Sequence, residues 1–189
     1  MDIHFFRPVK LIMAILYNKQ GDPADFIPHL SRIFSPVDYR SPVYPFDHTH
    51  YYEEEMGFPL SRILLSFERL IFPDSLAEIK HLIRVVESIY SHGSNRNINL
   101  DPGYLDLDKV VLASAKYGRQ KIPLKDGIYA DPTLEFTRHD FRPFEWTFPD
   151  FSTELYYEDL RHIRVIYKHQ FGRMAPVKIM GQGGFFISW

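Results

Sequence analysis

Arg62-Ile63-Leu64-Leu65-Ser66-Phe67-Glu68-Arg69-Leu70, followed after a short turn by a second apolar segment at 75–90, is the stretch that decides the fold. In the first segment, apolar side chains at 63, 65 and 67 alternate with Leu64, Ser66 and Glu68, which is the two-residue period of a β-strand. In the second segment, the apolar residues recur every three or four positions, which predicts an amphipathic helix. A strand followed by a long helix is typical of a mixed α and β fold.

The helix predicted over 75–90 has both a start and a stop signal in the sequence. Ser75 at the start and Glu78 three residues later fit a capping box, and Gly93 supplies the stop. One apolar stripe is predicted to face the core: Leu76, Ile79, Leu82, Ile83, Val86, Ile89 and Tyr90.

On the N-terminal side of this unit, the sequence predicts a strand, a helix and an extended segment. The apolar run from Lys10 to Tyr17 lacks clean alternation, as expected for a strand that is covered on both faces. Asp25 is predicted to cap the next helix, with Pro28 in its first turn. The segment 43–46 follows Pro42 and contains Pro45, which favours an edge strand.

On the C-terminal side, two short elements precede a hairpin and a last helix. A strand over 97–100 is expected to end in a turn at Asp101-Pro102-Gly103, and 109–116 is interpreted as a short helix capped by Asp106. The arms 121–124 and 128–136 flank Lys125-Asp126-Gly127 as a hairpin. The segment 152–169 is predicted to be the last helix, with an inward stripe of Tyr156, Leu160, Ile163 and Tyr167.

The predicted order of elements over the first hundred or so residues is strand, helix, strand, strand, helix, strand. This order predicts an α+β fold, a ferredoxin-like split βαβ sandwich (βαββαβ) with an added β-hairpin and a C-terminal helix. Helices are expected to cover one face of the sheet. The length predicts a single domain over 1–170, and 171–189 is expected to be a loose tail or an edge strand.

Composition restricts the class of protein. The chain of 189 residues has a formal charge of −2 and no cysteine, which excludes a disulfide framework, thiolate metal sites and a cysteine nucleophile. The apolar run 11–17 is far shorter than the roughly 20 residues of a membrane-spanning helix. The basic residues after Asp159 come without a nucleic-acid-binding motif, so nucleic acid is an unlikely partner. We expect a cytoplasmic protein without membrane contact.

Four short motifs are not explained by hydrophobic patterning. In chain order they are Phe46-Asp47-His48-Thr49-His50-Tyr51-Tyr52-Glu53-Glu54-Glu55-Met56-Gly57, Asn99-Leu100-Asp101-Pro102-Gly103-Tyr104-Leu105, Lys125-Asp126-Gly127-Ile128-Tyr129-Ala130 and Trp146-Thr147-Phe148-Pro149-Asp150. Together they resemble the uncharacterised bacterial and archaeal family called domain of unknown function 4416, from about Arg7 to Lys168. The resemblance implies no activity, because none is established for the family.

Five acids and four tyrosines, all but Glu68 from these motifs, are the candidate site residues. The acids are Asp47, Glu55, Glu68, Asp101 and Asp126, and the tyrosines beside them are Tyr51, Tyr52, Tyr104 and Tyr129. If the acids converge, they could bind a ligand or a hard cation such as Mg²⁺, with Glu55 or Asp101 as a catalytic base. The alternative is architectural: Asp101 and Asp126 are common turn residues, and Gly57, Gly103 and Gly127 are expected to adopt positive φ.

His48 and His50 are the only metal pair that the sequence suggests. Both imidazoles would project to one side of an extended segment, and Asp47 or Glu54 could add oxygen ligands. Two ligands without a third histidine motif are a weak pattern. A dedicated metal site is therefore not predicted, and these histidines are expected to be exposed.

Two functions from different classes fit the sequence. In the first, the motifs meet in an acidic and aromatic cleft that binds a small polar, phosphorylated or nucleotide-like ligand. In the second, the protein is a non-catalytic regulatory or scaffold module that forms a homodimer through its sheet, and the motifs only shape the fold. Whether the protein is an enzyme is left open by the sequence.

Overall fold

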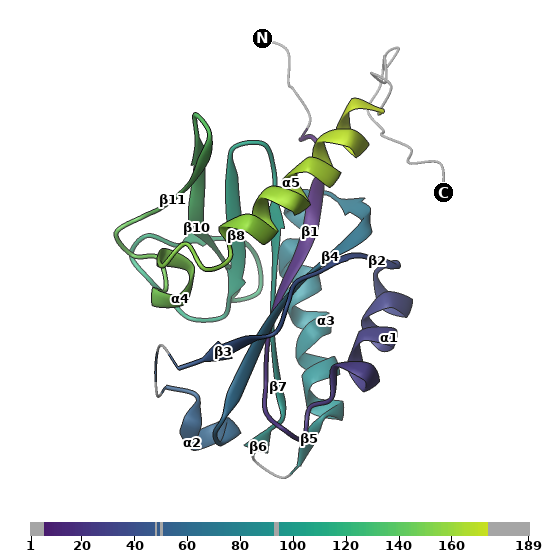
Figure 1. The fold of residues 1–189 in the computed structure, drawn as a ribbon, viewed down its shortest axis with the longest axis vertical. Coiled ribbons are helices and arrows are strands. Elements are labelled where there is room, and N and C mark those ends of the chain that lie inside the picture. The colour runs from purple at the N-terminus through teal and green to yellow at the C-terminus, as the bar shows by residue number, and fades with distance from the viewer. Residues whose placement is uncertain (1–5, 48, 50, 93–94, 174–189) are drawn as a thin grey trace.

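The computed structural model describes residues 6–47, 49, 51–92 and 95–173 (Figure 1). The strands are β1 Val9–Tyr17, β2 Val37–Arg40, β3 Tyr44–Phe46, β4 Leu60–Ile71, β5 Ser91–His92, β6 Asn95–Arg96, β7 Ile98–Leu105, β8 Lys109–Ser114, β9 Ile122–Pro123, β10 Tyr129–Thr137 and β11 Asp140–Pro143. The helices are α1 Pro23–Ile33, α2 Glu53–Met56, the 3₁₀ helix η1 Pro73–Ser75, α3 Leu76–Ile89, α4 Pro149–Ser152 and α5 Tyr157–Gly172. The chain therefore has the predicted mixed α+β character.

One large antiparallel sheet organises the fold. Its strands lie in the order β11-β10-β8-β7-β1-β4-β2, with β3 paired to β4 and β9 paired to β10. β5 and β6 form a separate two-stranded ribbon. The predicted strands 10–17 and 62–70 are confirmed as the neighbouring central strands β1 and β4, and 43–46 is confirmed as β3, which pairs only with β4.

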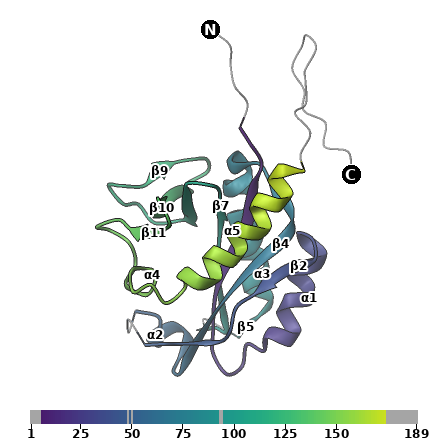
Figure 2. The same cartoon turned by 45° about the horizontal axis from the view of Figure 1, so that its top comes forward.

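Helices cover both faces of the sheet, whereas the sequence analysis expected them on one face only. Leu11, Met13 and Ile15 of β1 pack with α1 and α3, while Ile12 and Ala14 pack in the cluster that contains α4 and α5. Figures 1 and 2 show α5 lying across the face opposite to α1 and α3. The prediction was wrong because the last helix was treated as an appendage. A homodimer formed through the sheet, as in the alternative function, would therefore need a part of the sheet that α5 does not cover.

The predicted helix over 75–90 is confirmed as α3, and Leu76, Ile79, Ile83 and Val86 of the predicted stripe are buried, but the inner face also contains residues that were not predicted. Leu82 and Ile89 are 44% and 67% exposed, whereas Lys80 and Glu87 are only 7% and 6% exposed. The capping box is also wrong, because the Ser75 hydroxyl donates to the carbonyl of Phe72 and caps the preceding 3₁₀ turn instead. Two charged side chains are thus buried between α3 and the sheet.

The first helix begins earlier than predicted. Asp22, and not Asp25, is the N-cap, and its carboxylate accepts a hydrogen bond from the backbone N–H of Ala24 at 2.8 Å. Pro23 then occupies the first helical position, where a missing N–H has no cost. Pro28 consequently lies inside the helix rather than in its first turn.

The turn predicted at Asp101-Pro102-Gly103 is continuous strand. These residues pair with Ala14, Met13 and Ile12 of β1 as part of β7. Gly103 is needed here for space and not for positive φ, because an added Cβ would lie 2.5 Å from the Val111 carbonyl oxygen in β8. Positive φ does occur at the two other glycines considered, Gly57 and Gly127.

The helix predicted over 109–116 is wrong. The segment forms β8, which lies between β7 and β10, and its apolar residues are buried on both faces of the sheet. β-branched residues such as Val110 and Val111 favour a strand once neighbouring strands are available. Asp106 caps the turn before β8 instead of a helix, accepting from the backbone N–H groups of Asp108 and Lys109.

The predicted hairpin and last helix are confirmed. β9 and β10 pair around the tight turn at Lys125-Asp126-Gly127, and a bulge after Pro132 lets β10 remain an interior strand between β8 and β11. The last helix is divided into α4 and α5, and its predicted stripe is buried. The tail beyond 173 lies outside the described residues. Within the residues that the structure describes, no helix is long and apolar enough to span a membrane.

Candidate functional site

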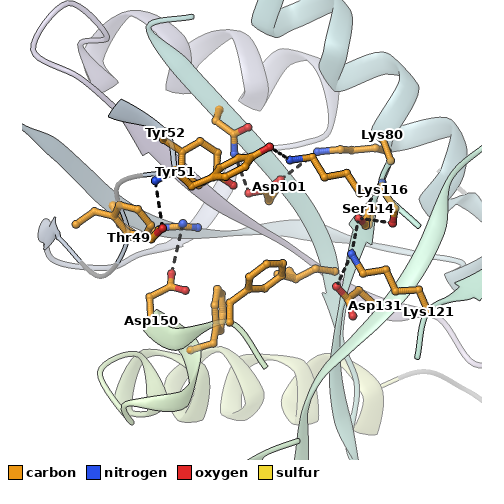
Figure 3. A pocket seen from close by; sticks show the side chains of 18 of the residues that line it. Thr49, Tyr51, Tyr52, Lys80, Asp101, Ser114, Lys116, Lys121, Asp131 and Asp150 are labelled. Carbon is orange, nitrogen blue, oxygen red and sulfur yellow. Dashed lines mark hydrogen bonds and ion pairs between the residues drawn. The ribbon is translucent and has the colours of Figure 1, made fainter. Parts of the chain in front are cut away.

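A cavity of about 520 Å³ opens beside the β7–β8 part of the sheet (Figure 3). Its walls come from the segment between β3 and α2, the inner face of α3, β7, the end of β8 with the following loop, and the start of α4. Pockets of this volume commonly hold small organic ligands. The cationic lining residues are Arg62, Lys80, Arg84, Arg96, Lys116 and Lys121, the carboxylates are Glu87, Asp101, Asp131 and Asp150, and the aromatic residues are Phe46, Tyr51, Tyr52, Tyr117, Phe148 and Phe151.

The floor of the cavity is a hydrogen-bonded triad of Lys80, Asp101 and Asn99. The Lys80 ammonium donates to the Leu100 carbonyl at 2.9 Å and to Asp101 Oδ1 at 3.1 Å, and Asn99 Nδ2 donates to Asp101 Oδ2 at 2.8 Å. Burial alone would raise the pKa of Asp101, but Lys80 and Arg62 with these hydrogen bonds lower it overall. Asp101 is therefore a stable carboxylate and a poor proton donor.

A second charged group stands behind this floor. Arg96 donates to both carboxylate oxygens of Glu55, at 2.6 and 2.8 Å, and to Asn99 Oδ1 at 2.9 Å. Hydrogen bonds from Arg96 lower the pKa of Glu55. Burial raises the pKa of Glu87, which accepts the Leu100 N–H at 2.6 Å. Glu55 is thus engaged by Arg96 and does not line the cavity itself.

The opposite walls contain two buried ion pairs. Arg62 lies 3.3 Å from Asp150 and 4.8 Å from the centre of the Phe46 ring, and its buried Nε has no partner among the described residues. Lys121 lies 3.1 Å from Asp131 and donates to the Ser114 hydroxyl at 2.8 Å. All four side chains of these pairs are at most 8% exposed, so removing one partner would leave a largely desolvated charge in the wall.

The rim of the cavity differs from the floor, because its cations are not paired with carboxylates. Among the described residues, Arg84 has neither a hydrogen bond nor an ion pair, and Lys116 meets no carboxylate within ion-pair distance. Lys116 instead donates to the hydroxyl of Tyr51, which reaches it from the other side of the cavity (Figure 3). Tyr51 and Tyr117 are 62% and 79% exposed. The rim therefore combines free positive charge with exposed aromatic rings.

The structure brings together some of the sequence-predicted site residues. Tyr51, Tyr52 and Asp101 line the cavity. Glu55 does not line it, but it binds Arg96, which does. Burial raises the pKa of Tyr52, so its phenol remains protonated. These residues come from segments about fifty positions apart, which supports the expected meeting of two motifs.

The other predicted residues lie elsewhere. Asp47 is exposed outside the lining, and Glu68 is on β4 at a position that also does not line it. Tyr104 lines a separate cavity of about 250 Å³. Asp126 lies in the hairpin turn with φ of 51°, and Tyr129 contacts the rim only through Tyr117, with ring centres 6.2 Å apart.

His48 and His50 are not among the described residues. Elsewhere in the described part of the chain, no group of three or more His, Cys, Asp or Glu side chains is arranged to hold a metal ion.

The sequence analysis missed most of the charged lining. Lys80, Arg84, Glu87, Arg96, Lys116, Lys121 and Asp131 were not among the predicted site residues, and Asn99 appeared only as the first residue of a motif. One signal was available: Lys80, Ile83 and Glu87 are spaced 3 and 4 apart and share the inner face of α3. The remaining residues carry no such pattern, because their partners lie on other strands.

The two carboxylates at the floor, the half-buried Asp101 and the buried Glu87, are expected to respond to pH in opposite ways. The lowered pKa of Asp101 contributes stability above the unfolded value of about 4, and that stability is lost as the pH falls through the folded pKa. The raised pKa of Glu87 contributes stability only below about 4.3, and it is lost as the pH rises through the folded pKa.

We therefore expect Asp101→Asn to destabilise the protein at pH 7 and to flatten its loss of stability below pH 4. Glu87→Gln is expected to be nearly neutral at pH 7, because it removes a charge that burial disfavours while keeping an acceptor for the Leu100 N–H. Urea unfolding between pH 3 and pH 7 measures both effects. Equal pH trends in the two variants would contradict this assignment of charges.

The family model described as Domain of unknown function (DUF4416) matches residues 7–167. The chain therefore belongs to this family. No curated protein and no solved structure matches the chain. The family relationship covers all the segments that line the cavity, but it brings no ligand or activity with it.

Proposed function

We propose that the cavity binds a small phosphorylated or nucleotide-like ligand. The observation that carries the proposal is the presence of two rim cations, Arg84 and Lys116, that no carboxylate among the described residues neutralises. Six cationic and four acidic side chains line the cavity, so its formal charge favours an anion. Arginine and lysine are the usual partners of phosphate groups in proteins.

The aromatic side chains of the rim support the same class of ligand. Tyr51, Tyr117 and Phe148 combine exposed ring surface with a place in the cavity lining. Exposed rings beside a cavity offer a surface on which a planar or ring-shaped ligand can stack. The rim cations would then bind the phosphate of a nucleotide-like ligand, and the exposed aromatic rings at the same opening would stack on its ring.

The arrangement is better suited to binding than to acid–base catalysis. Asp101 is held as a carboxylate by Lys80, and Glu55 is held by Arg96, so neither of the two suggested bases is free to exchange a proton readily at neutral pH. We therefore propose that the protein binds this ligand, and the proposal does not require catalysis.

We also propose that the central part of the fold is a ferredoxin-like split βαβ unit. Two observations support this. The chain runs β1-α1-β2 and then β4-α3-β7, and the four strands lie in the order β7-β1-β4-β2 with antiparallel neighbours. β8 to β11 extend the sheet beyond β7. A cytoplasmic location remains part of the proposal and agrees with the absence of cysteine in the sequence.

A thermal-shift panel on the wild-type protein tests the ligand proposal. Compounds that bind the folded state raise its melting temperature. We expect stabilisation by ribose 5-phosphate or a nucleoside monophosphate, little effect from their dephosphorylated forms, and a smaller shift at higher salt because exposed charges are screened. Equal shifts with and without the phosphate group would contradict the proposal.

A further inference from the structure

The floor of the cavity offers a different set of hydrogen-bonding groups from the rim. Arg84 and Lys116 at the rim can only donate hydrogen bonds. The triad of Lys80, Asn99 and Asp101 on the floor combines donors with a carboxylate that can only accept. The two ends of the cavity therefore fit different chemical groups of a ligand.

The triad retains unused hydrogen-bonding capacity among the described residues. Each oxygen of Asp101 accepts one hydrogen bond, from Lys80 or from Asn99, and a carboxylate oxygen can accept two. The Lys80 ammonium uses two of its three N–H groups, and Asn99 Nδ2 uses one of its two. All three side chains line the cavity, so this spare capacity is available to a ligand.

A phosphate group does not match this floor, because it would bring negative charge next to Asp101 and could not donate to the carboxylate. A hydroxyl group matches it, because the same oxygen both donates and accepts. Two neighbouring hydroxyls could donate to the two oxygens of Asp101 while accepting from Lys80 and Asn99. A vicinal diol is therefore the group that satisfies the floor most completely.

The floor and the rim of the cavity differ in burial, and this difference sets the orientation of a bound ligand. Lys80 and Asn99 are almost fully buried, whereas Arg84 and Lys116 are exposed. A neutral diol can be desolvated on the floor at modest cost when its hydrogen bonds are replaced. A phosphate dianion is more favourably placed at the rim, where it remains partly hydrated. The phosphate and the diol are thus expected at opposite ends of the ligand.

We infer, on the basis of the proposed function, that the ligand is a sugar phosphate, free or as part of a ribonucleoside phosphate. Its vicinal hydroxyls bind Asp101, Lys80 and Asn99, and its phosphate lies between Arg84 and Lys116. The same chemistry is shared by ribose 5-phosphate and adenosine 5′-monophosphate, which differ only in the group on the anomeric carbon. Tyr52 lies near Asp101 and provides ring surface for the sugar, while Tyr51 lies at the rim.

Calorimetric titration of the wild-type protein tests this assignment with two matched pairs of probes. The pairs are ribose 5-phosphate with 2-deoxyribose 5-phosphate, and adenosine 5′-monophosphate with its 2′-deoxy analogue. We expect loss of one hydroxyl to weaken binding about tenfold or more, because Asp101 loses one of its partners. The stronger of the two ribose-containing probes identifies the source, a free sugar phosphate or a nucleotide.

Asp101→Asn provides a second, independent readout. It retains the shape of the side chain but turns one acceptor into a donor, so the variant is expected to bind the ribose and deoxyribose probes equally. Because the probe pairs are first compared on the wild type, a destabilised variant does not weaken the test.

Two results would overturn the inference and are distinguishable from each other. Equal wild-type affinity for the ribose and deoxyribose probes would exclude a diol on the floor while leaving the phosphate proposal standing. Failure of every phosphorylated probe to bind the wild type would overturn both, because the rim would then not receive phosphate.

Discussion

The variant Arg84→Ala/Lys116→Ala is expected to bind ribose 5-phosphate and adenosine 5′-monophosphate about 30-fold more weakly than the wild type. The figure assumes roughly 1 kcal/mol for each exposed cation that contacts the phosphate, and about 1.4 kcal/mol corresponds to tenfold in affinity. Both side chains are exposed and bear no ion pair among the described residues, so stability should change little. Calorimetry at low and at physiological salt measures the loss.

A matched control is available on the same molecule. Arg32 lies at the end of α1 and Lys168 on α5, and both are exposed and outside the cavity lining. Arg32→Ala/Lys168→Ala makes the same change in net charge and is expected to retain wild-type affinity. If both double variants lost affinity equally, the effect would come from overall charge and not from a rim site.

The variant Asp150→Ala is expected to lower the free energy of unfolding by about 3–5 kcal/mol, because it leaves the buried Arg62 without its ion-pair partner. Both side chains of the pair are about 5% exposed, and the pair links β4 to α4 across the wall of the cavity. The Tyr156 hydroxyl, 3.3 Å from Asp150, would also lose an acceptor. Urea unfolding at pH 7 measures the change.

Two further variants separate a buried ion pair from charge removal in general. Asp140→Ala removes the partner of Arg161 in an exposed pair and is expected to cost less than about 1 kcal/mol. Replacing Arg62 and Asp150 together with leucine should recover much of the loss, because no unpaired charge remains. An Asp150→Ala variant as stable as the wild type would show that water solvates Arg62 in the wall of the cavity.

The sequence predicted those elements whose patterns are local. β4 and α3 were found from periods of two and about 3.6, and the hairpin from Lys125-Asp126-Gly127, because each pattern is complete within one segment. β8 was missed because the sequence at 109–116 is compatible with a helix in isolation. Its strand conformation depends on pairing with β7 and β10.

The cavity was only partly predictable for a related reason. Asp101 and Tyr52 were named from their motifs, but Lys80 was missed, because the predicted inner face of the helix contained only apolar residues and assigned Leu82 to the core. The charge of Lys80 is tolerated inside because Asp101, 21 residues away, and the Leu100 carbonyl are brought to it by β7. A partner on another element leaves no spacing that a single segment can reveal.

Glu55, which forms an ion pair with Arg96, is a second case in which a partner on another element could not be predicted from the sequence. Glu55 was suggested as a base, yet Arg96 from the β5–β6 ribbon binds both of its carboxylate oxygens. The chemistry of an acid is decided by the groups around it, and these come from distant positions in the chain. The sequence predicted an acidic cleft, whereas in the structure the charged groups of the cavity that have no ion-pair partner among the described residues are positive.

The central claim is that the segment around Tyr51, α3 and the end of β8 form one chamber for a phosphorylated sugar. Nuclear magnetic resonance titration of the ¹⁵N-labelled wild-type protein with ribose 5-phosphate tests it most directly. We expect saturable shifts confined to amides near Tyr51, Arg84, Asp101 and Lys116. Shifts that cluster on another face, or no saturable shifts at millimolar ligand, would contradict it.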